Sequence, residues 1–481
     1  MVMRSFISLL FFFPGLALAG AISLSPKDVA DLLAKQSYRA QEVNLTAQQS
    51  RLARATVEKN YDFSLSADSG YQVSKFESAT NTYLLNDNLN TTNVTLSKPF
   101  STGTTFSLSY IRSLEQPELS SASPTPATDV AIDSIGLVLT QNLLKNFFGY
   151  ADRSDLQAAE STYQSTQVSR ISQLQDLVLE GIRDYWTAFV AQQTFQGALS
   201  SRNRYEKLVE QIKKKTNYGY SNPGELAQAQ AELEVRQQNV KNTSMTYLAA
   251  LDSLISLLRL PPGSEILFNV SEEIPPPPAI KTVDIENLRP LKSSKLKLEA
   301  ANNSLGYYNS KSYPDLSFVG KIYQQGLEKK NDASYSEMAS GAHPKYYLGL
   351  QFQYSFGSGY SNEDSLNKKV TRDLAEAQLN RSRLEIKDKE NNLARKLQST
   401  FAIAQSSKSQ KGFREKASQE LSKSYTQGRT DISLLITALN NYFDSEVQFS
   451  KSIGDYQTAL NEWSAFRDEL ISNTDPQKET Q

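Results

Sequence analysis

The sequence has no cysteine, a single histidine and almost no net charge. Its 481 residues include 51 basic and 52 acidic side chains, which give a net charge of -1. Without cysteine the chain has neither disulfide bonds nor a lipid-modified N-terminal cysteine. The lone histidine, His343, cannot complete a Ser/His/Asp set or a cluster of metal ligands, and the balanced charge gives no bulk attraction to nucleic acid. We therefore expect a protein that is not an enzyme, with no cofactor, no metal site and no nucleic-acid partner.

Long apolar runs are missing beyond the N-terminus. Residues 1–19 place Arg4 before a short apolar run that ends in Ala-Leu-Ala at positions 17–19, the pattern of a secretory signal peptide. An uncleaved membrane anchor is the alternative, and it fits poorly with a run this short that contains Pro14. No other stretch approaches the ~20 apolar residues of a spanning helix. Any residence in a membrane is therefore expected to be through β-strands.

The longest regular pattern in the chain begins in the stretch from Tyr425 to Ala438. From Ile432 onward, apolar residues recur in steps of three and four as far as Leu470, which predicts a long helix with one packed seam. Gly428 lies in a polar run just before this seam, where a helix can end in a left-handed residue and the next helix can begin. The sequence therefore predicts a tight bend of a helical hairpin at Gly428.

This bend has a counterpart earlier in the chain. A shift of 209 residues places Gly219 on Gly428, and the residues after Gly219 again open a helix. Each bend follows a stretch of more than sixty residues without proline. About 65 residues at ~1.5 Å per residue predict a helix about 100 Å long. Two such hairpins indicate an internal duplication.

Strand-like alternation of apolar and polar residues precedes each long helix. It occurs at 61–73 and 132–141 in the first half, and at 313–323 and 346–356 in the second. An additional alternating stretch at 94–110 is interrupted by a turn at 101–104. Aromatic residues at the strand ends are typical of strands that cross a membrane.

These patterns divide the chain into nine segments, with a fold that is mainly α and carries a β portion. The expected segments are a signal peptide (1–19), an N-terminal helix (20–60), a first strand region with long loops and an extra hairpin (61–145), a first long helical hairpin bending near 217–224 (146–260), a proline-rich connector (261–283), a helix (284–312), a second strand region (313–357), a second long helical hairpin bending near 425–431 (358–472) and a disordered tail (473–481).

The order and spacing of these features, repeated twice, resemble the TolC-like outer-membrane efflux protein family (outer membrane factors). The residues that carry the resemblance are Leu137-Val-Leu-Thr-Gln-Asn-Leu-Leu144 before the first long helix, the two bends, the spacing of Tyr425, Gly428, Leu434 and Ala438, and the halves bounded by proline. The resemblance covers essentially the whole chain after the signal peptide.

The resemblance implies a homotrimer in the outer membrane of a Gram-negative-type bacterium, extending into the periplasm. Twelve strands, four per protomer, would form one β-barrel in outer-membrane lipid, continued by a periplasmic barrel of helices. The protein would be the passive exit duct of a tripartite efflux or type I secretion system, opened at its helical tips by a periplasmic adaptor and an inner-membrane pump. Independently, a protomer with few strands cannot close a barrel alone, and lipid does not tolerate an open edge.

The resemblance also implies a gate at the periplasmic bends. Tyr425 matches the family's gate tyrosine, and Glu225 stands where the family has an aspartate. Thr430 occupies the position of the family's arginine, and the neighbouring Arg429 could replace it, with Asp431 beside them. A solvated hairpin surface is the alternative interpretation of these residues.

The pore constriction departs from the family. Leu434 and Thr437 occupy positions where the family has two aspartates. A ring of carboxylates favours cations, so we expect no cation selectivity unless Asp431 or Asp444 replaces the ring. The extra hairpin near 94–110 leaves open whether the barrel gains strands, and the exported substrate cannot be inferred from this chain. The remaining alternative function is a periplasmic coiled-coil structural or adhesin-like envelope protein.

Overall fold

The structure, a computed structural model, describes residues 22–75, 83–219, 222–270, 273–280, 283–329, 331–354 and 359–471. The expected signal peptide and C-terminal tail lie outside the described residues. The described elements, in chain order, are β1 (Ile22–Leu24), α1 (Pro26–Gln36), α2 (Tyr38–Lys59), β2 (Ser64–Ser74), β3 (Leu84–Pro99), β4 (Thr104–Leu119), β5 (Val130–Asn142), the short 3-10 helix η1 (Phe147–Gly149), α3 (Tyr150–Asn217), α4 (Glu225–Leu258), β6 (Ile266–Phe268), the 3-10 helix η2 (Ile285–Asn287), α5 (Arg289–Lys311), β7 (Asp315–Glu328), α6 (Asn331–Ser340), β8 (Pro344–Gln353), α7 (Gly359–Thr426) and α8 (Ile432–Phe466).

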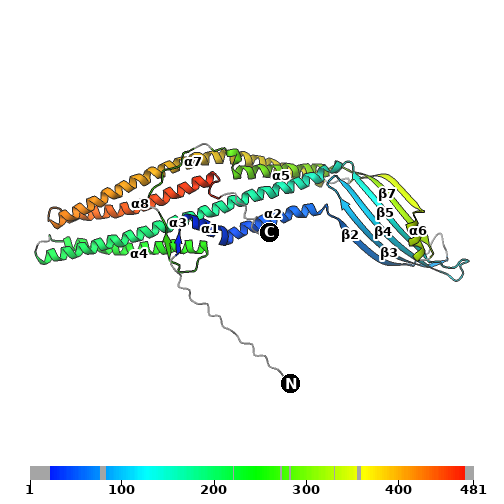
Figure 1. Ribbon diagram of the computed structural model, residues 1–481, viewed down its shortest axis with the longest axis horizontal. Helices are drawn as coiled ribbons and strands as arrows, with labels where there is room; N and C mark the ends of the chain where they lie inside the picture. The colour runs from blue at the N-terminus through cyan, green and yellow to red at the C-terminus, as the bar shows by residue number, and fades with distance from the viewer. Residues whose placement is uncertain are drawn as a thin grey trace, which may run out of the picture. The chain divides into compact units, whose positions relative to one another are not determined.

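The chain forms two compact units. Unit 1 comprises residues 1–45, 170–288 and 385–481, and unit 2 comprises residues 46–169 and 289–384. Unit 1 is helical and contains both hairpin bends, whereas unit 2 contains a large antiparallel sheet. Figure 1 shows the hairpins α3–α4 and α7–α8 and, separately, the strands of the sheet side by side.

The start of unit 1 departs from the single N-terminal helix expected over 20–60. Ser25 caps α1 through a reciprocal pair of bonds with Asp28, and Pro26 occupies the first turn. The helix then breaks at Ser37, whose backbone is extended, and α2 follows. The break allows α1 to lie against α3, where Gly181 leaves room for the side chain of Leu33.

The proline-rich connector expected at 261–283 contains a short strand that the sequence pattern does not reveal. This strand, β6, pairs in parallel with β1. The buried hydroxyl of Tyr185 in α3 donates to the carbonyl oxygen of Leu24 in β1 at 3.0 Å. A core of buried apolar residues from β1, α1, α3, α4 and β6 surrounds this contact. The connector is therefore fixed at β6 to the rest of unit 1.

Unit 2 contains one six-stranded sheet, in which neighbouring strands are antiparallel. The strand order is β2-β3-β4-β5-β7-β8. The sheet has six strands where the family resemblance implies four, because the additional hairpin pairs along its whole length as β3 and β4. Gly103, with φ of 72°, forms its turn at the expected position.

Two of the segments between the predicted strands also form strands, and a third contains a helix. Residues 84–91 belong to β3, and Pro117 lies within β4. These polar segments can form strands because the partner strands satisfy their backbone hydrogen-bonding groups. Side chains on the polar face of the sheet do not need to be apolar. The polar segment 326–344 contains α6, where Ser334 donates to the fully buried carboxylate of Asp133 at 2.6 Å.

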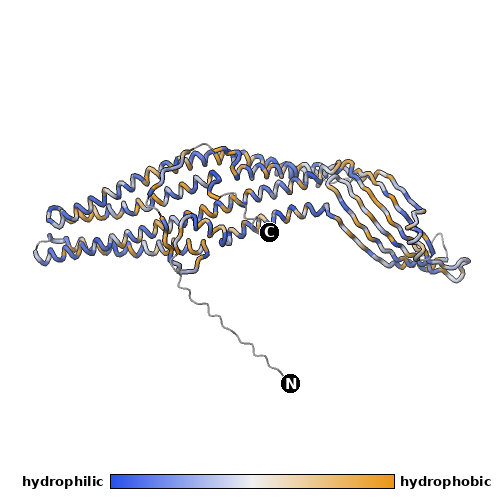
Figure 2. The backbone as a smooth tube through the Cα atoms, viewed as in Figure 1, coloured by the Kyte–Doolittle hydropathy of each residue, from blue (hydrophilic) through white to orange (hydrophobic). Residues whose placement is uncertain are grey.

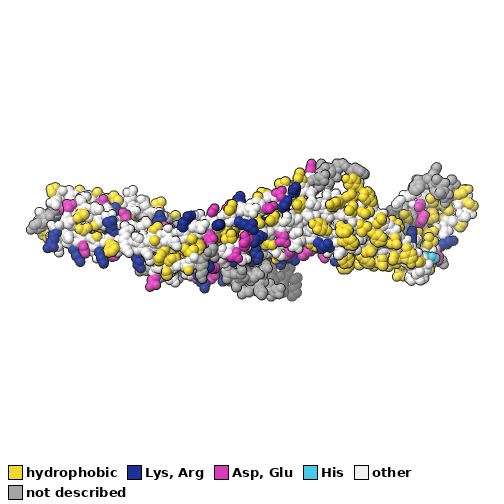
Figure 3. All heavy atoms as spheres, turned by 90° about the horizontal axis from the view of Figure 1, so that it is seen from above, with side chains coloured by type: hydrophobic (Ala, Val, Ile, Leu, Met, Phe, Trp, Pro, Cys, Tyr) yellow, Lys and Arg dark blue, Asp and Glu magenta, His cyan; other side chains and the backbone are white. Residues whose placement is uncertain are grey.

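The sheet has one apolar face and one polar face. Figure 2 shows that its strands mix hydrophobic and hydrophilic residues along their length, and Figure 3 shows hydrophobic side chains gathered over the sheet. On β8, for example, Tyr346, Leu348, Leu350 and Phe352 are all more than 60% exposed. No helix among the described residues is both long and apolar enough to cross a membrane.

Candidate functional site

The candidate site is the pair of hairpin bends in unit 1, together with the helix ends that they join. In the second bend, α7 ends at Thr426 and Gly428 adopts φ of 69°. The backbone N–H of Gly428 donates to the carbonyl of Tyr425, and that of Arg429 donates to the carbonyl of Ser424. These two bonds form a Schellman motif, which satisfies carbonyl groups at the end of α7.

The first bend uses glycine in the same way. Gly219 adopts φ of 76°, and its N–H donates to the carbonyl of Thr216 in the last turn of α3. Gly224, with φ of 89°, is the residue before α4. Residues 220 and 221 lie outside the described residues. Both glycines that the sequence identifies as bends are therefore left-handed residues at helix ends.

The structure brings the predicted gate pair Tyr425 and Glu225 together. The hydroxyl of Tyr425 donates to a carboxylate oxygen of Glu225 at 3.3 Å, and both residues are buried. The second carboxylate oxygen accepts from the side-chain amide of Asn222 at 2.8 Å. Burial, followed by the proximity of Glu225, raises the pKa of Tyr425 to about 12. The hydroxyl is therefore protonated at neutral pH and remains a donor to the carboxylate.

A third residue, Lys215, completes this contact, and the sequence analysis missed it. Its Nζ donates to the backbone carbonyl of Tyr425 at 2.8 Å and lies 4.0 Å from the centre of the Tyr425 ring. A lysine at the C-terminal end of a helix also interacts favourably with the helix dipole. The sequence does contain a signal for Lys215, because Leu208 and Ile212 belong to an apolar stripe of α3 and the next position of that stripe, three residues further on, is Lys215.

The other predicted gate residues lie outside this contact. Arg429 is exposed, and its side chain makes no hydrogen bond or ion pair with any residue that the structure describes. Thr430 is half-buried in the bend. Asp431 caps α8 by accepting from the N–H of Ser433 at 2.7 Å. This backbone hydrogen bond holds the pKa of Asp431 below its ordinary value, so the carboxylate has a local capping role.

The predicted pore positions Leu434 and Thr437 share one exposed face of α8. Leu434 is 52% exposed, whereas its neighbours Leu435 and Ile436 are buried. Asp444 is exposed on the same face, two turns beyond Thr437. At ~1.5 Å per residue it lies about 15 Å along the helix from Leu434. Asp444 is thus displaced from the predicted constriction, and the nearer Asp431, three residues before Leu434, caps the helix.

The helix ends are held by a common apolar core. Residues of α3, α4, α7 and α8 meet in one buried cluster, and Glu225 and Tyr425 lie at its end. The members of this cluster are Tyr205, Leu208, Val209, Ile212, Ala229, Tyr425, Ile432, Leu435, Ile436 and Leu439. The hydroxyl of Tyr205 also donates to the side chain of Asn440 at 2.6 Å, which joins α3 to α8. This core fixes the two bends to each other.

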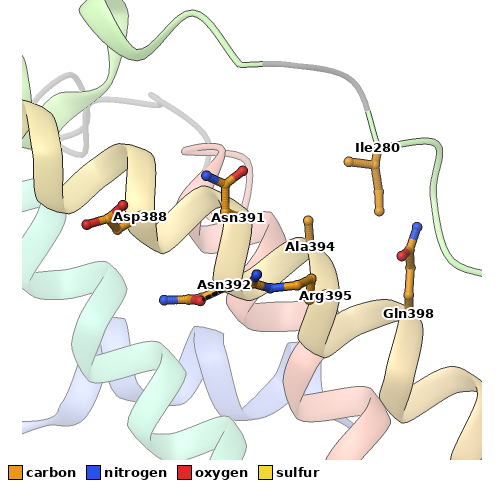
Figure 4. A pocket seen from close by; sticks show the side chains of 7 residues that line it. All are labelled: Ile280, Asp388, Asn391, Asn392, Ala394, Arg395 and Gln398. Carbon is orange, nitrogen blue, oxygen red and sulfur yellow. Dashed lines mark hydrogen bonds between the residues drawn. The ribbon is translucent and has the colours of Figure 1, made fainter.

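A shallow groove elsewhere in unit 1 lies between the connector and α7. Figure 4 shows Ile280 of the connector facing Gln398 of the helix, and Arg395 bonded to Asn392. Its remaining lining residues are Asp388, Asn391 and Ala394. These side chains contain no nucleophile with an adjacent base. Within the described parts of the chain, no group of three or more His, Cys, Asp or Glu residues could hold a metal ion.

Comparison with known proteins identifies the fold. No protein-family model matches the chain, and no curated protein matches it in sequence. Among solved structures, the CmeC outer-membrane channel of Campylobacter jejuni is 14% identical with a TM-score of 0.67, over 94% of this chain and 88% of that chain. The outer-membrane protein VceC of Vibrio cholerae is 13% identical with a TM-score of 0.65, over 93% of this chain and 97% of that chain.

A third similar structure is the open state of the MtrE outer-membrane channel of Neisseria gonorrhoeae. It is 12% identical with a TM-score of 0.63, over 94% of this chain and 90% of that chain. In each case the match extends over nearly the full length of both chains, and so includes both the sheet and the helical hairpins. The chain therefore has the fold of the TolC-like outer-membrane channels.

Proposed function

We propose that this protein is an outer-membrane channel that serves as the passive exit duct of a tripartite efflux or type I secretion system. The observation that carries the proposal is the sheet of unit 2, whose one exposed apolar face suits contact with lipid. The full-length likeness to outer-membrane channels supports it. The location is the outer membrane of a Gram-negative-type bacterium, with the helices in the periplasm.

The working unit is a homotrimer. The sheet of one protomer ends in two unpaired edge strands, β2 and β8, within the described part of the chain. An unpaired edge in lipid leaves backbone groups without partners at a cost of several kcal/mol each. Pairing with further copies removes these edges. A periplasmic adaptor and an inner-membrane pump supply substrate and energy, and the adaptor docks at the hairpin bends.

The gate is the contact that joins Tyr425 to Glu225 and Lys215. Each hydrogen bond to a charged group stabilises the closed bends by about 1.5–3 kcal/mol when well formed, and the 3.3 Å Tyr425–Glu225 bond belongs at the lower end. If the Tyr425–Glu225 bond alone contributes ~1 kcal/mol in each of three copies, the closed state gains ~3 kcal/mol from it, which is roughly a hundredfold in population. Opening requires these contacts to separate.

Planar bilayers test both parts of the proposal. The purified wild-type protein should give discrete conductance steps, and Tyr425→Phe combined with Glu225→Gln should raise the resting conductance because the hydroxyl donor and the carboxylate charge are both lost. Tyr185→Phe is the matched control, since it removes a buried tyrosine hydroxyl bond away from the bends. An unchanged resting conductance in the double variant would leave these residues as ordinary hairpin surface.

The alternative is a coiled-coil structural or adhesin-like protein of the periplasm, and the long helices of unit 1 alone would suit it. Cell fractionation separates the two. A protein found only in the soluble periplasm, with no conductance in bilayers, would contradict the channel. Recovery from the outer membrane, together with a co-purifying adaptor and pump, would support it.

A further inference from the structure

The additional hairpin, β3 and β4, lies in the middle of the sheet and not at its edge. It is inserted between β2 and β5, and its two strands pair with both of these neighbours as well as with each other. The first half of the chain thereby supplies four strands to the sheet and the second half supplies two. Removing the hairpin from the sheet would require β2 and β5 to pair anew.

The apolar face of the sheet continues without interruption across this hairpin. One cross-strand row consists of apolar side chains on all six strands, each of which is at least a third exposed: Leu65, Leu96, Leu108, Leu137, Ile322 and Tyr346. On the opposite face, the hairpin presents serine hydroxyls, and Ser97 and Ser107 bond to each other at 2.9 Å. The hairpin thus has the same apolar and polar sides as the strands around it.

The exposed apolar band crosses the sheet obliquely. On β2 it extends from the row of Leu65 to Val73, towards the end of that strand, whereas on β8 it extends from Tyr346 to Phe352, towards α7. The midpoint of the band on β2 is displaced from its midpoint on β8 by about seven residues, or ~24 Å along the strands. The two strands are separated by five strand spacings of ~4.8 Å each, or ~24 Å across the sheet. Equal displacements along the strands and across the sheet correspond to a strand tilt of about 45°, the tilt of strands that cross a membrane.

We propose that β3 and β4 are strands of the membrane wall, so that three copies of this six-stranded protomer close a barrel of eighteen strands. The proposal rests on the proposed homotrimeric channel and changes its dimensions. At ~4.8 Å per strand and a tilt of about 45°, eighteen strands enclose a backbone diameter of about 40 Å, against about 25 Å for twelve. Barrels of this larger size leave a wide aqueous lumen. The barrel is then not the narrowest part of the duct.

Single cysteines test this placement, because the chain has no cysteine of its own. Variants Leu96→Cys and Leu108→Cys place a thiol on the apolar side of the hairpin, and Ser97→Cys and Ser107→Cys place one on the polar side. Leu137→Cys reports on β5. Each variant is reconstituted as the full chain in phosphatidylcholine vesicles and treated with a charged, membrane-impermeant thiol reagent. Trimer formation is checked for each variant by mass.

If the hairpin is part of the wall, Leu96→Cys and Leu108→Cys escape labelling as Leu137→Cys does, and both serine variants are labelled from the lumen. Labelling of Leu96→Cys and Leu108→Cys beside a protected Leu137→Cys would overturn the proposal and leave the channel intact. Labelling of Leu137→Cys itself would instead contradict the membrane channel. A strand count of the trimer by electron microscopy gives an independent readout, since eighteen is expected and twelve would refute the proposal.

Discussion

At the scale of single residues, Tyr425 is held by two charged side chains of the other hairpin. Its hydroxyl bonds to Glu225, while its carbonyl and ring contact Lys215. The pair Tyr425 and Glu225 follows from the family resemblance. Lys215 does not. The apolar stripe of α3 places this lysine on the packed face, but only the packing of the two hairpins shows that it contacts Tyr425.

The contribution of Lys215 is testable by substitution. Lys215→Met retains most of the aliphatic stem but removes the charge and the donor. A cation–π contact is worth about 0.5–1 kcal/mol and a hydrogen bond from a charged donor about 1.5–3 kcal/mol, so we expect the closed bends to lose roughly 2 kcal/mol per protomer. Single-channel recording should show a higher resting open probability.

Lys213→Met is the matched control for this prediction. Lys213 is exposed and two residues away on the same helix, so its replacement should leave the resting open probability at the wild-type level. Equal behaviour of the two variants would mean that Lys215 has no special part in closure.

At the scale of the elements, each bend depends on a glycine with positive φ. A side chain added at Gly428 would meet no atom within 4 Å, so the cost of Gly428→Ala is confined to the backbone. A left-handed conformation costs a residue with a Cβ roughly 1–2 kcal/mol. We expect thermal unfolding to show a loss of stability of that size.

Gly412, inside α7, provides a control of opposite sign. A Cβ there also meets nothing within 4 Å, and its φ is not positive. Gly412→Ala should therefore stabilise the helix by about 0.5–1 kcal/mol. If both alanine variants shifted stability in the same direction, backbone conformation would not be the cause.

A second prediction at this scale concerns Glu462, which ties α8 to two other helices. Its carboxylate bonds to Arg183 of α3 and Lys396 of α7, each at 2.6 Å. Burial raises the pKa of Glu462, but the hydrogen bonds and charges of Lys396 and Arg183 outweigh it, and the net pKa is lowered. The stabilisation is therefore present above the unfolded-state pKa and is lost as the pH falls through the lower folded-state pKa.

Glu462→Gln should destabilise the protein at neutral pH by about 2 kcal/mol, from the loss of charge-assisted hydrogen bonds. The difference from wild type should shrink as the pH falls below the ordinary range of glutamate and the wild-type carboxylate becomes protonated. Thermal unfolding followed by circular dichroism across this range measures both effects. Glu206→Gln, which removes a surface ion pair with Arg202, should change little. A constant Glu462→Gln deficit down to the lowest pH would contradict the assignment.

At the scale of the whole molecule, the two faces of the sheet should differ in whether they tolerate a charged side chain. Leu137 and Val138 are neighbours in β5 and point to opposite faces. Arginine on a lipid face near the middle of the membrane costs about 2–4 kcal/mol, whereas a lumen face tolerates charge. Leu137→Arg should therefore sharply reduce the protein recovered from outer membranes, and Val138→Arg should not. Equal recovery of both variants would show that neither face contacts lipid.

Much of the fold was predictable from sequence patterns. Gly219 and Gly428 both occupy the left-handed helix ends that their polar surroundings indicate. The break at Ser37, the strand β6 and the helix α6 were not predictable. The break is local and the two elements are short, and such short features depend on contacts with distant segments more than on local propensity.

Local sequence patterns are enough to predict the long helices, their bends and their repetition, because helical periods, glycine bends and proline boundaries act over neighbouring residues. Three features follow from tertiary packing alone: the contact of Lys215 with Tyr425, the capping role of Asp431, and the pairing of the additional hairpin as two full strands of the sheet. These outcomes depend on which distant segments pair and pack. A polar strand such as β3 has little β-propensity of its own, so its formation depends on pairing with the neighbouring strands.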